Sequence, residues 1–167
     1  MTPPADHRRH DSALDKAPWL DDASLPVGTT LLTLDGALPV EHLVPGDRVI
    51  TRDGAYRLRA ALRHTVPQGL RMVRVSRNAL GGKPDTDITL PARQRVLIRD
   101  WRARAIYNTP QACVPVERLI DGEYVRWTVD TPAYVISLHF DRPVILYAAG
   151  LELQSTARLA PPVSGAP

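Results

Sequence analysis

Short apolar runs, each closed by turn-forming residues, make up most of the chain between residues 24 and 155. The first clear run, 28–33, is rich in β-branched residues and leads into an Asp-Gly pair, which is a strong turn signal. No segment keeps the apolar period of 3.6 residues that marks an amphipathic helix. The pattern therefore predicts an all-β domain with only single helical turns, at 39–43 and 116–119. Further strands are expected at 48–51, 56–64, 70–75, 87–90, 95–99, 112–115, 124–129, 133–140 and 143–148.

The two ends of the chain lack this pattern. Residues 1–23 are rich in Pro, Asp, His and Arg, and residues 156–167 are rich in Pro and Ala. Segments of such composition bury too little apolar surface to order themselves. We therefore expect one domain over residues 24–155, with a flexible N-terminal arm at 1–23 and a flexible tail at 156–167.

Charge and cysteine content exclude several classes of protein. The 167 residues carry a net charge of +3, which permits contact with nucleic acid without requiring it. The single cysteine, Cys113, rules out an internal disulfide framework and any multi-cysteine metal site, which suggests a reducing compartment. No apolar run approaches the ~20 residues of a membrane span, and the N-terminus lacks the apolar core of a secretory signal. We therefore expect a soluble, cytoplasmic protein without membrane association, metal or cofactor.

The most informative pattern lies in residues 27–54, VGTTLLTLDGALPVEHLVPGDRVITRDG. A strand runs into an Asp-Gly turn, and a short helical turn led by Pro39 directs Leu43 toward the core. The Pro-Gly-Asp sequence at 45–47 then turns the chain sharply into a second strand, which ends in another Asp-Gly turn. The glycines supply backbone conformations that other residues resist.

This stretch resembles the N-terminal block of the Hint superfamily, the module of inteins and hedgehog autoprocessing proteins, and is most similar to bacterial Hint-domain proteins. The shared elements are Gly-Thr, Asp-Gly, Pro-Val-Glu, Leu and Pro-Gly-Asp, in the same order. Residues 90–101, LPARQRVLIRDW, resemble the family's central block, and residues 134–150, YVISLHFDRPVILYAAG, resemble its C-terminal block. The resemblance extends over residues 24–155 and implies an all-β Hint fold, a pseudo-symmetric horseshoe of short strands.

The resemblance also implies a self-cleavage chemistry whose usual residues are largely replaced. In the family, a Cys or Ser at the first position attacks the preceding carbonyl, and a central-block His donates a proton to the departing amide nitrogen. By position the nucleophile is Ser24, the scissile bond is Ala23–Ser24, and Gln94, which cannot deliver a proton, replaces the histidine. The remaining positions carry Pro91 in place of Ser or Thr, Ser137 in place of the strand His, Asp141 unchanged and Pro143 in place of the last His.

Losing the thiol, the acid and the supporting hydroxyl together predicts an inactive module, kept as a binding or structural unit for an unknown protein partner. General acid catalysis alone contributes about 100- to 10,000-fold to a rate. One alternative is slow N–O acyl rearrangement at Ala23–Ser24, assisted by Gln94 or by His139, which shares a strand face with Ser137. A second alternative is weak nucleic-acid binding through an arginine-rich strand face made of Arg57, Arg59, Arg63, Arg71, Arg74 and Arg77.

Simpler structural roles compete with each of these assignments. Ser24 would then be only a polar residue that leads into the first strand, and His139 a core-satisfied or solvent-facing histidine. Cys113 lies in an apolar segment and is expected to act as a small hydrophobe. Trp101 is expected to pack in the core or at its rim. A solvated strand face that discourages aggregation explains the arginines more simply than nucleic-acid binding does.

Overall fold

The computed structural model describes residues 24–155, and the predicted arm and tail lie outside these described residues. Short strands make up most of the described chain, which confirms the predicted all-β class. The first strands are β1 Ser24–Pro26, β2 Thr30–Thr33, β3 Gly36–Pro39, β4 Arg48–Thr51, β5 Gly54–Arg57, β6 Ala60–Thr65 and β7 Met72–Val75. The later strands are β8 Ile88–Leu90, β9 Arg95–Ile98, β10 Ala112–Pro115, β11 Val125–Thr128, β12 Tyr134–His139, β13 Val144–Ala148 and β14 Leu151–Ser155. The helical elements are the 3-10 turns η2 Val40–His42 and η3 Val116–Leu119 and the α-helix α2 Trp101–Tyr107.

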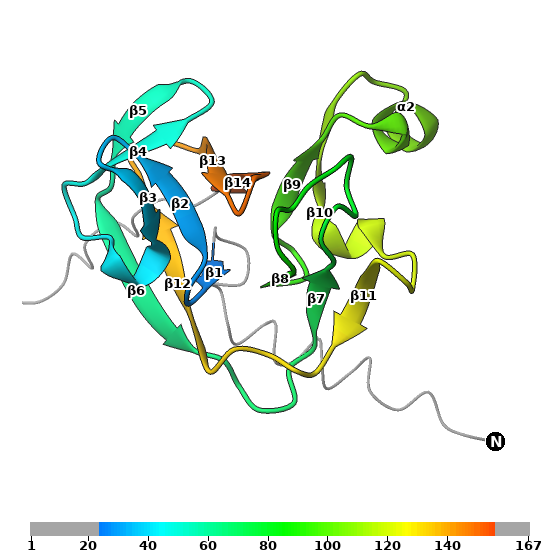
Figure 1. Cartoon of the computed structure of the whole chain (residues 1–167), viewed down its shortest axis with the longest axis horizontal. Coiled ribbons are helices and arrows are strands. Elements are labelled where there is room, and N and C mark those ends of the chain that lie inside the picture. Colours follow the sequence, from blue (N-terminus) through cyan, green and yellow to red (C-terminus); the bar gives the residue numbers. More distant parts are fainter. Residues whose placement is uncertain (1–23, 156–167) are drawn as a thin grey trace, which may run out of the picture.

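The strands of the described region are arranged as two lobes. One lobe contains β2 to β6 with β12, the other contains β7 to β11 with α2, and two connections join them at the bottom of the view (Figure 1). A three-stranded sheet has the order β1-β12-β6, and another has the order β11-β7-β8. The eight-stranded sheet runs β10-β9-β14-β13-β2-β4-β5 with β3 beside β2, so its β9–β14 ladder links the lobes. The result is a horseshoe with β1, β13 and β14 near its centre.

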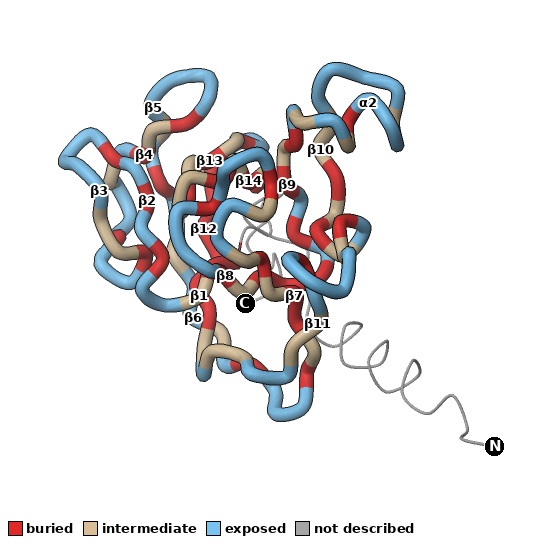
Figure 2. Tube along the Cα trace, turned by 45° about the vertical axis from the view of Figure 1, so that its right-hand side comes forward, coloured by how far each residue is buried: buried red, intermediate tan, exposed pale blue. Residues whose placement is uncertain are grey.

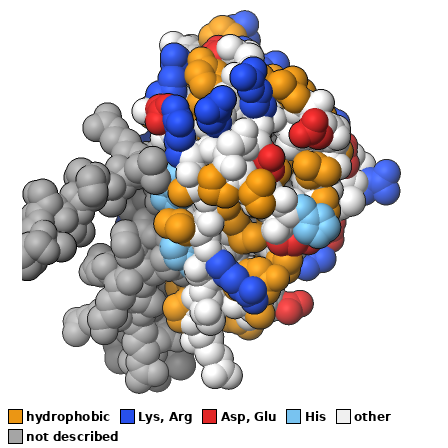
Figure 3. Space-filling view, turned by 90° about the vertical axis from the view of Figure 1, so that its left-hand side faces the viewer, with side chains coloured by type: hydrophobic (Ala, Val, Ile, Leu, Met, Phe, Trp, Pro, Cys, Tyr) orange, Lys and Arg blue, Asp and Glu red, His pale blue; other side chains and the backbone are white. Residues whose placement is uncertain are grey.

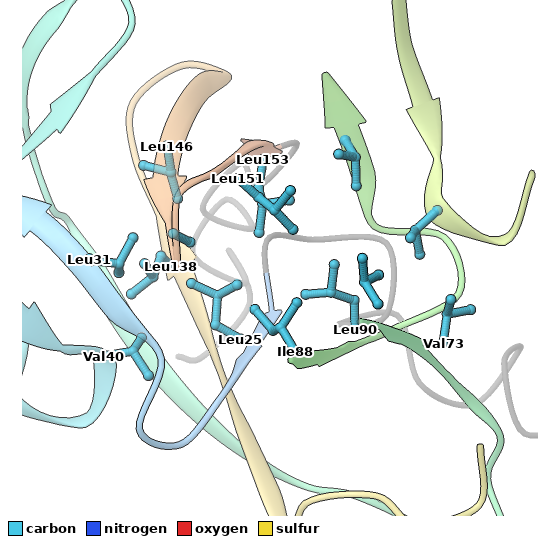
Figure 4. Packing of buried hydrophobic residues seen from close by; sticks show 14 of the residues in the cluster. Leu25, Leu31, Val40, Val73, Ile88, Leu90, Leu138, Leu146, Leu151 and Leu153 are labelled. Atoms are coloured by element: carbon cyan, nitrogen blue, oxygen red, sulfur yellow. The ribbon is translucent and has the colours of Figure 1, made fainter. Parts of the chain in front are cut away.

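The hydrophobic core lies where the two lobes meet. Leu25 of β1 points toward Ile88 and Leu90 of β8, and Leu151 and Leu153 of β14 lie beside them (Figure 4). All five side chains are buried. Figure 2 shows the same distribution along the trace, with buried residues on the inner strands and exposed residues at the hairpin tips. Burying one such leucine contributes about 1.5–3 kcal/mol, so this cluster holds the lobes together.

Two turns of the same sequence type, Thr-x-Asp-Gly, close the hairpins after β2 and β4. The Thr33 hydroxyl donates to the Gly36 carbonyl at 2.7 Å and accepts from the Asp35 N–H at 3.1 Å. Thr51 makes the matching pair of contacts in the second turn, where its hydroxyl donates to Gly54 at 2.7 Å. Both glycines have a strongly positive φ, 101° and 114°, which side-chain-bearing residues rarely adopt. The Asp-Gly signals in the sequence therefore correspond to real turns.

The single strand predicted at 56–64 is wrong, because the structure divides this segment into β5 and β6. Leu58 lies between the two strands and is fully buried. Its N–H donates to the Asp47 carbonyl and its carbonyl accepts from the Gly46 N–H, both at 2.8 Å. These bonds hold Leu58 against the residues just before β4 while its side chain is buried in the core, and the chain passes to another sheet after this point.

Helix α2 is a second departure from the predicted pattern. The Asp100 carboxylate caps it by accepting from the Arg102 N–H at 3.0 Å, and Asn108 ends it with a left-handed φ of 54°. Ala103 is its one buried residue, so the helix has no apolar period to reveal it in the sequence. Trp101 is 67% exposed and is therefore not a core residue. Within residues 24–155, no helix is long and apolar enough to cross a membrane.

Candidate functional site

Ser24 is the first residue of β1 and is fully buried. In the antiparallel ladder between β1 and β12 it lies directly opposite Ser137. Residues paired in this way share one face of the sheet and have Cβ atoms about 4.5–5.5 Å apart. The structure therefore brings together two of the positions that the Hint resemblance marks as chemical, although neither carries the most common residue.

Two imidazoles converge on the Ser137 hydroxyl. Ser137 Oγ lies 2.7 Å from His64 Nε2 and 2.9 Å from His139 Nε2. His139 follows Ser137 by two residues on β12, so the expected common face of these two residues is what the structure has. His64 comes from the neighbouring strand β6, where its ladder partner is Val135. We name His64, Ser137 and His139 the His–Ser–His chain.

The three side chains of the His–Ser–His chain differ in burial. His64 is half-buried, Ser137 is fully buried, and His139 is only 6% exposed. His139 Nδ1 is buried and has no hydrogen-bond partner among the described residues. An unpartnered buried polar atom destabilises the folded state by about 1–3 kcal/mol, so this cluster stabilises the fold less than apolar side chains would. It has the residue types of an acid–base site in a water-poor environment.

The Pro-Val-Glu motif fixes the loop between β1 and β2. Glu41 Oε2 accepts a hydrogen bond from the Gly28 N–H at 2.7 Å, and the Val40 N–H donates to the Thr29 carbonyl at 2.8 Å. The bond from Gly28 is the main reason why the pKa of Glu41 is lowered from its ordinary value of 4.5. These contacts hold the chain immediately after β1 and therefore help to set the position of Ser24.

Gln94 lies in a different environment. It is 1% exposed, and its Nε2 donates to the Arg95 carbonyl at 3.1 Å and to the Gln154 carbonyl at 3.0 Å. Its Oε1 is buried without a hydrogen-bond partner among the described residues. The Gln94 amide hydrogens are therefore committed to the β9–β14 region, and none of these contacts reaches Ser24 or the His–Ser–His chain.

Asp141, the acidic residue retained from the family pattern, lies at the surface. Its Oδ2 accepts from Arg59 Nε at 2.9 Å and from Arg59 Nη2 at 2.6 Å. The Asp141 side chain is 64% exposed, and an ion pair of this kind contributes about 0–1 kcal/mol. Pro143 is also exposed. Of the candidate site residues, the structure thus groups Ser24 with His139 and separates them from Asp141.

His64 is the site residue that sequence reasoning missed. It lies outside the three family blocks, in a segment whose arginines suggested a solvated strand face or weak nucleic-acid binding. The available signal was alternation, because His64 and Leu62 share the face of β6 that pairs with the Ser137 side of β12. The register between distant strands cannot be read from a single sequence. Alternation alone therefore could not show that His64 lies close to Ser137.

Cys113 behaves as the sequence suggested. It is half-buried, and its Sγ donates to Gln154 Oε1 at 3.2 Å. Burial raises the pKa of the Cys113 thiol, which disfavours the reactive thiolate. The cytoplasmic location inferred from this single cysteine stays a prediction. Within residues 24–155, no three His, Cys, Asp or Glu side chains form a group that could hold a metal ion.

The six arginines expected to form a basic face are divided between the two lobes, because β5 and β6 lie in one lobe and β7 in the other (Figure 1). Four of them have partners within the chain. These are the Arg59–Asp141 and Arg74–Asp87 ion pairs and the stacking of Arg63 over Tyr134 and Arg71 over Trp127. On the face seen in Figure 3, Lys and Arg side chains gather at the end where Figure 1 places the β4–β5 hairpin. Nucleic-acid binding stays a prediction.

Comparison with known proteins agrees with this geometry. Residues 23–159 match a family model described as Hint domain. Among solved structures, a bacterial intein-like domain from Clostridium thermocellum aligns with a TM-score of 0.56 and 15% identity over 80% of this chain and 98% of that one. The gp41-1 intein aligns with a TM-score of 0.53 and 10% identity, again over 80% and 98% of the two chains. The Msm DnaB1 intein splicing domain bound with zinc aligns with a TM-score of 0.52 and 19% identity, over 80% and 99%. No curated protein sequence matches the chain. At these identities the structural likeness establishes the fold alone, and it confirms the expected Hint fold.

Proposed function

Because the chain belongs to the Hint domain family, we propose that it carries out the family's first step in a serine form, a slow N–O acyl rearrangement at Ala23–Ser24. Ser24 is the nucleophile in this proposal. A serine hydroxyl is a weak nucleophile at neutral pH and needs a nearby base. The function therefore depends on whether imidazoles are available near Ser24.

The position of Ser24 opposite the His–Ser–His chain carries the proposal. Position 137 has lost the family's strand histidine, but two imidazole Nε2 atoms lie within 2.9 Å of the Ser137 hydroxyl that replaces it. The imidazoles of His64 and His139 are thus one hydrogen bond away from position 137, where the family pattern has its histidine. They lie on the same sheet face as Ser24. A module retained only for its shape would gain stability from apolar residues here.

The proposed step balances without any added reagent. Ser24 Oγ attacks the Ala23 carbonyl carbon, a C–O ester bond forms, and the C–N bond to Ser24 breaks. The hydroxyl proton passes to the neighbouring acid–base groups, and the Ser24 nitrogen takes up a proton to become an amine. Water or added hydroxylamine then cleaves the ester, which releases fragment 1–23 and leaves a chain that begins at Ser24.

The rearrangement is expected to be slow because the central block supplies no acid. The Gln94 amide hydrogens bond two backbone carbonyls, and an amide cannot protonate a leaving group near neutral pH. Losing general acid assistance costs about 100- to 10,000-fold in rate.

Intact-mass measurement tests this function. Purified full chain is incubated for days with and without hydroxylamine, alongside Ser24→Ala and a control, Ser76→Ala, which removes a half-buried serine from another part of the chain. The proposal expects a fragment ending at Ala23 that hydroxylamine increases, that Ser24→Ala abolishes and that Ser76→Ala leaves unchanged. A full-length mass that stays constant in all samples would sink the proposal.

A non-cleaving module that binds a protein partner or serves as a structural unit is the second candidate. The commitment of Gln94 to the β9–β14 region favours it, because the central-block position has taken a structural role. This candidate expects no fragment from the wild-type chain, together with a stability loss for Gln94 variants. It also expects partner binding that does not change in Ser24→Ala, which distinguishes it from the first candidate.

A further inference from the structure

We propose that the His–Ser–His chain is the proton-transfer path of this acyl rearrangement, with His64 as its solvent end. This inference rests on the proposed function and names residues outside the family pattern that would make it work. His64 and His139 are positioning residues in this scheme, because both act through the Ser137 hydroxyl. In this scheme the chain removes the Ser24 hydroxyl proton, and the protonation of the leaving nitrogen that position 94 no longer assists stays slow.

The hydrogen-bond geometry suits a proton relay. The Ser137 hydroxyl has one hydrogen and two lone pairs, so it can donate to one imidazole while it accepts from the other. Its oxygen is 2.7 Å from His64 Nε2 and 2.9 Å from His139 Nε2, and both distances are normal for well-formed hydrogen bonds. A proton that enters at one imidazole can therefore leave at the other when both bonds reverse direction.

The burial of the three side chains gives the relay a direction. His139 and Ser137 are closed off from solvent, whereas His64 is half-buried and is the most exposed of the three. Ser24 lies opposite Ser137 at the buried part of the chain. A hydroxyl proton removed there needs a route outward, and the hydrogen bond from Ser137 to His64 offers one beside the ladder position of Ser24.

The second nitrogen of His139 argues against a purely structural role. His139 Nδ1 is buried without a partner among the described residues, so the imidazole is only half satisfied. A leucine or valine, such as the buried Leu25, Val135 and Leu138 of the same sheet, would avoid that cost. A half-satisfied buried imidazole is therefore better explained by the chemistry of its other nitrogen.

Chemical rescue tests the relay on the full chain. The rate of hydroxylamine-dependent release of fragment 1–23 is measured for the wild type, His64→Ala, His64→Gln and Ser137→Ala. The control is His42→Ala, which removes an exposed histidine from η2. Imidazole is then added to each sample. Since His64 is half-buried, the space left by His64→Ala is open to a small solute.

The relay predicts that His64→Ala and His64→Gln slow release by about 100-fold, the lower end of acid–base contributions. Added imidazole restores His64→Ala and does not restore Ser137→Ala, while His42→Ala matches the wild type. Release that is unchanged in both His64 variants, or a slow His64→Ala that imidazole leaves slow, overturns the inference alone. No release from the wild type overturns the proposed function and the inference with it.

Discussion

Ser24 and Ser137 lie directly opposite each other in the ladder between β1 and β12. This pairing places the first residue of the domain against the position where the family carries a strand histidine. Neither residue is the usual one of the family pattern, and the fold pairs the two serines directly. Chemistry at this site therefore depends on what surrounds the two serines, and His64 and His139 are the groups found there.

Ser24→Cys is expected to accelerate the acyl rearrangement. A thiol is more acidic and more nucleophilic than a hydroxyl, so the same surroundings should support a faster attack on the Ala23 carbonyl. We expect thiol-induced release of fragment 1–23 at least about ten-fold faster than hydroxylamine-induced release from the wild type. Intact-mass time courses measure both rates. The background variant Cys113→Ala excludes a contribution from the native thiol, and a Ser24→Cys chain that thiols leave intact contradicts the prediction.

Gln94→Leu is expected to destabilise the domain. The change removes the donor of two part-buried hydrogen bonds, to the Arg95 and Gln154 carbonyls. The loss of such a hydrogen bond costs about 0.5–1.5 kcal/mol. Urea unfolding followed by Trp fluorescence measures the loss. Gln68→Leu, the same change at an exposed glutamine, is the matched control and should change the free energy of unfolding much less. Equal losses in the two variants would show that Gln94 has no special structural role.

Much of the fold was predictable because local sequence determines it. The Asp-Gly turns, the Pro-Gly-Asp corner and the strand at 48–51 each need a few neighbouring residues, and the structure has all of them. Helix α2 was not visible, because it buries only Ala103 and so lacks an amphipathic pattern. Strand β14 was also not predicted, because its pairing partners β13 and β9 are brought to it by the whole horseshoe.

The candidate site was only half predictable for the same reason. Ser24 and the common face of Ser137 and His139 follow from motif position and strand alternation. His64 required the register between β6 and β12, which is a long-range property of the fold. Asp141 kept its family identity but pairs with Arg59 at the surface, and a residue's identity does not reveal such a partner.

Leu25→Ala is expected to weaken the contact between the lobes. Leu25 is fully buried and points toward Ile88 and Leu90 across the centre of the horseshoe (Figure 4). Truncating a core leucine in this way costs about 2–5 kcal/mol. Leu62→Ala on β6 is the control, because that side chain is 47% exposed and should cost about 0.5 kcal/mol or less. Urea midpoints compare the two, and similar losses would contradict the assignment of Leu25 to the core.

Glu41→Gln is expected to alter how stability depends on pH. The Gly28 N–H, and to a smaller extent the Glu41 N–H, lower the pKa of the Glu41 carboxyl from 4.5, so the folded chain favours its charged form. A lowered pKa adds stability that is fully present above the ordinary value and is lost as pH falls through the folded value. The wild type should therefore exceed Glu41→Gln in stability above about pH 5, and the difference should shrink toward lower pH. Thermal unfolding from pH 7 to pH 3 measures it, with Glu123→Gln as an exposed glutamate control. A constant difference across this range would mean that the carboxylate charge does not strengthen the bond from Gly28.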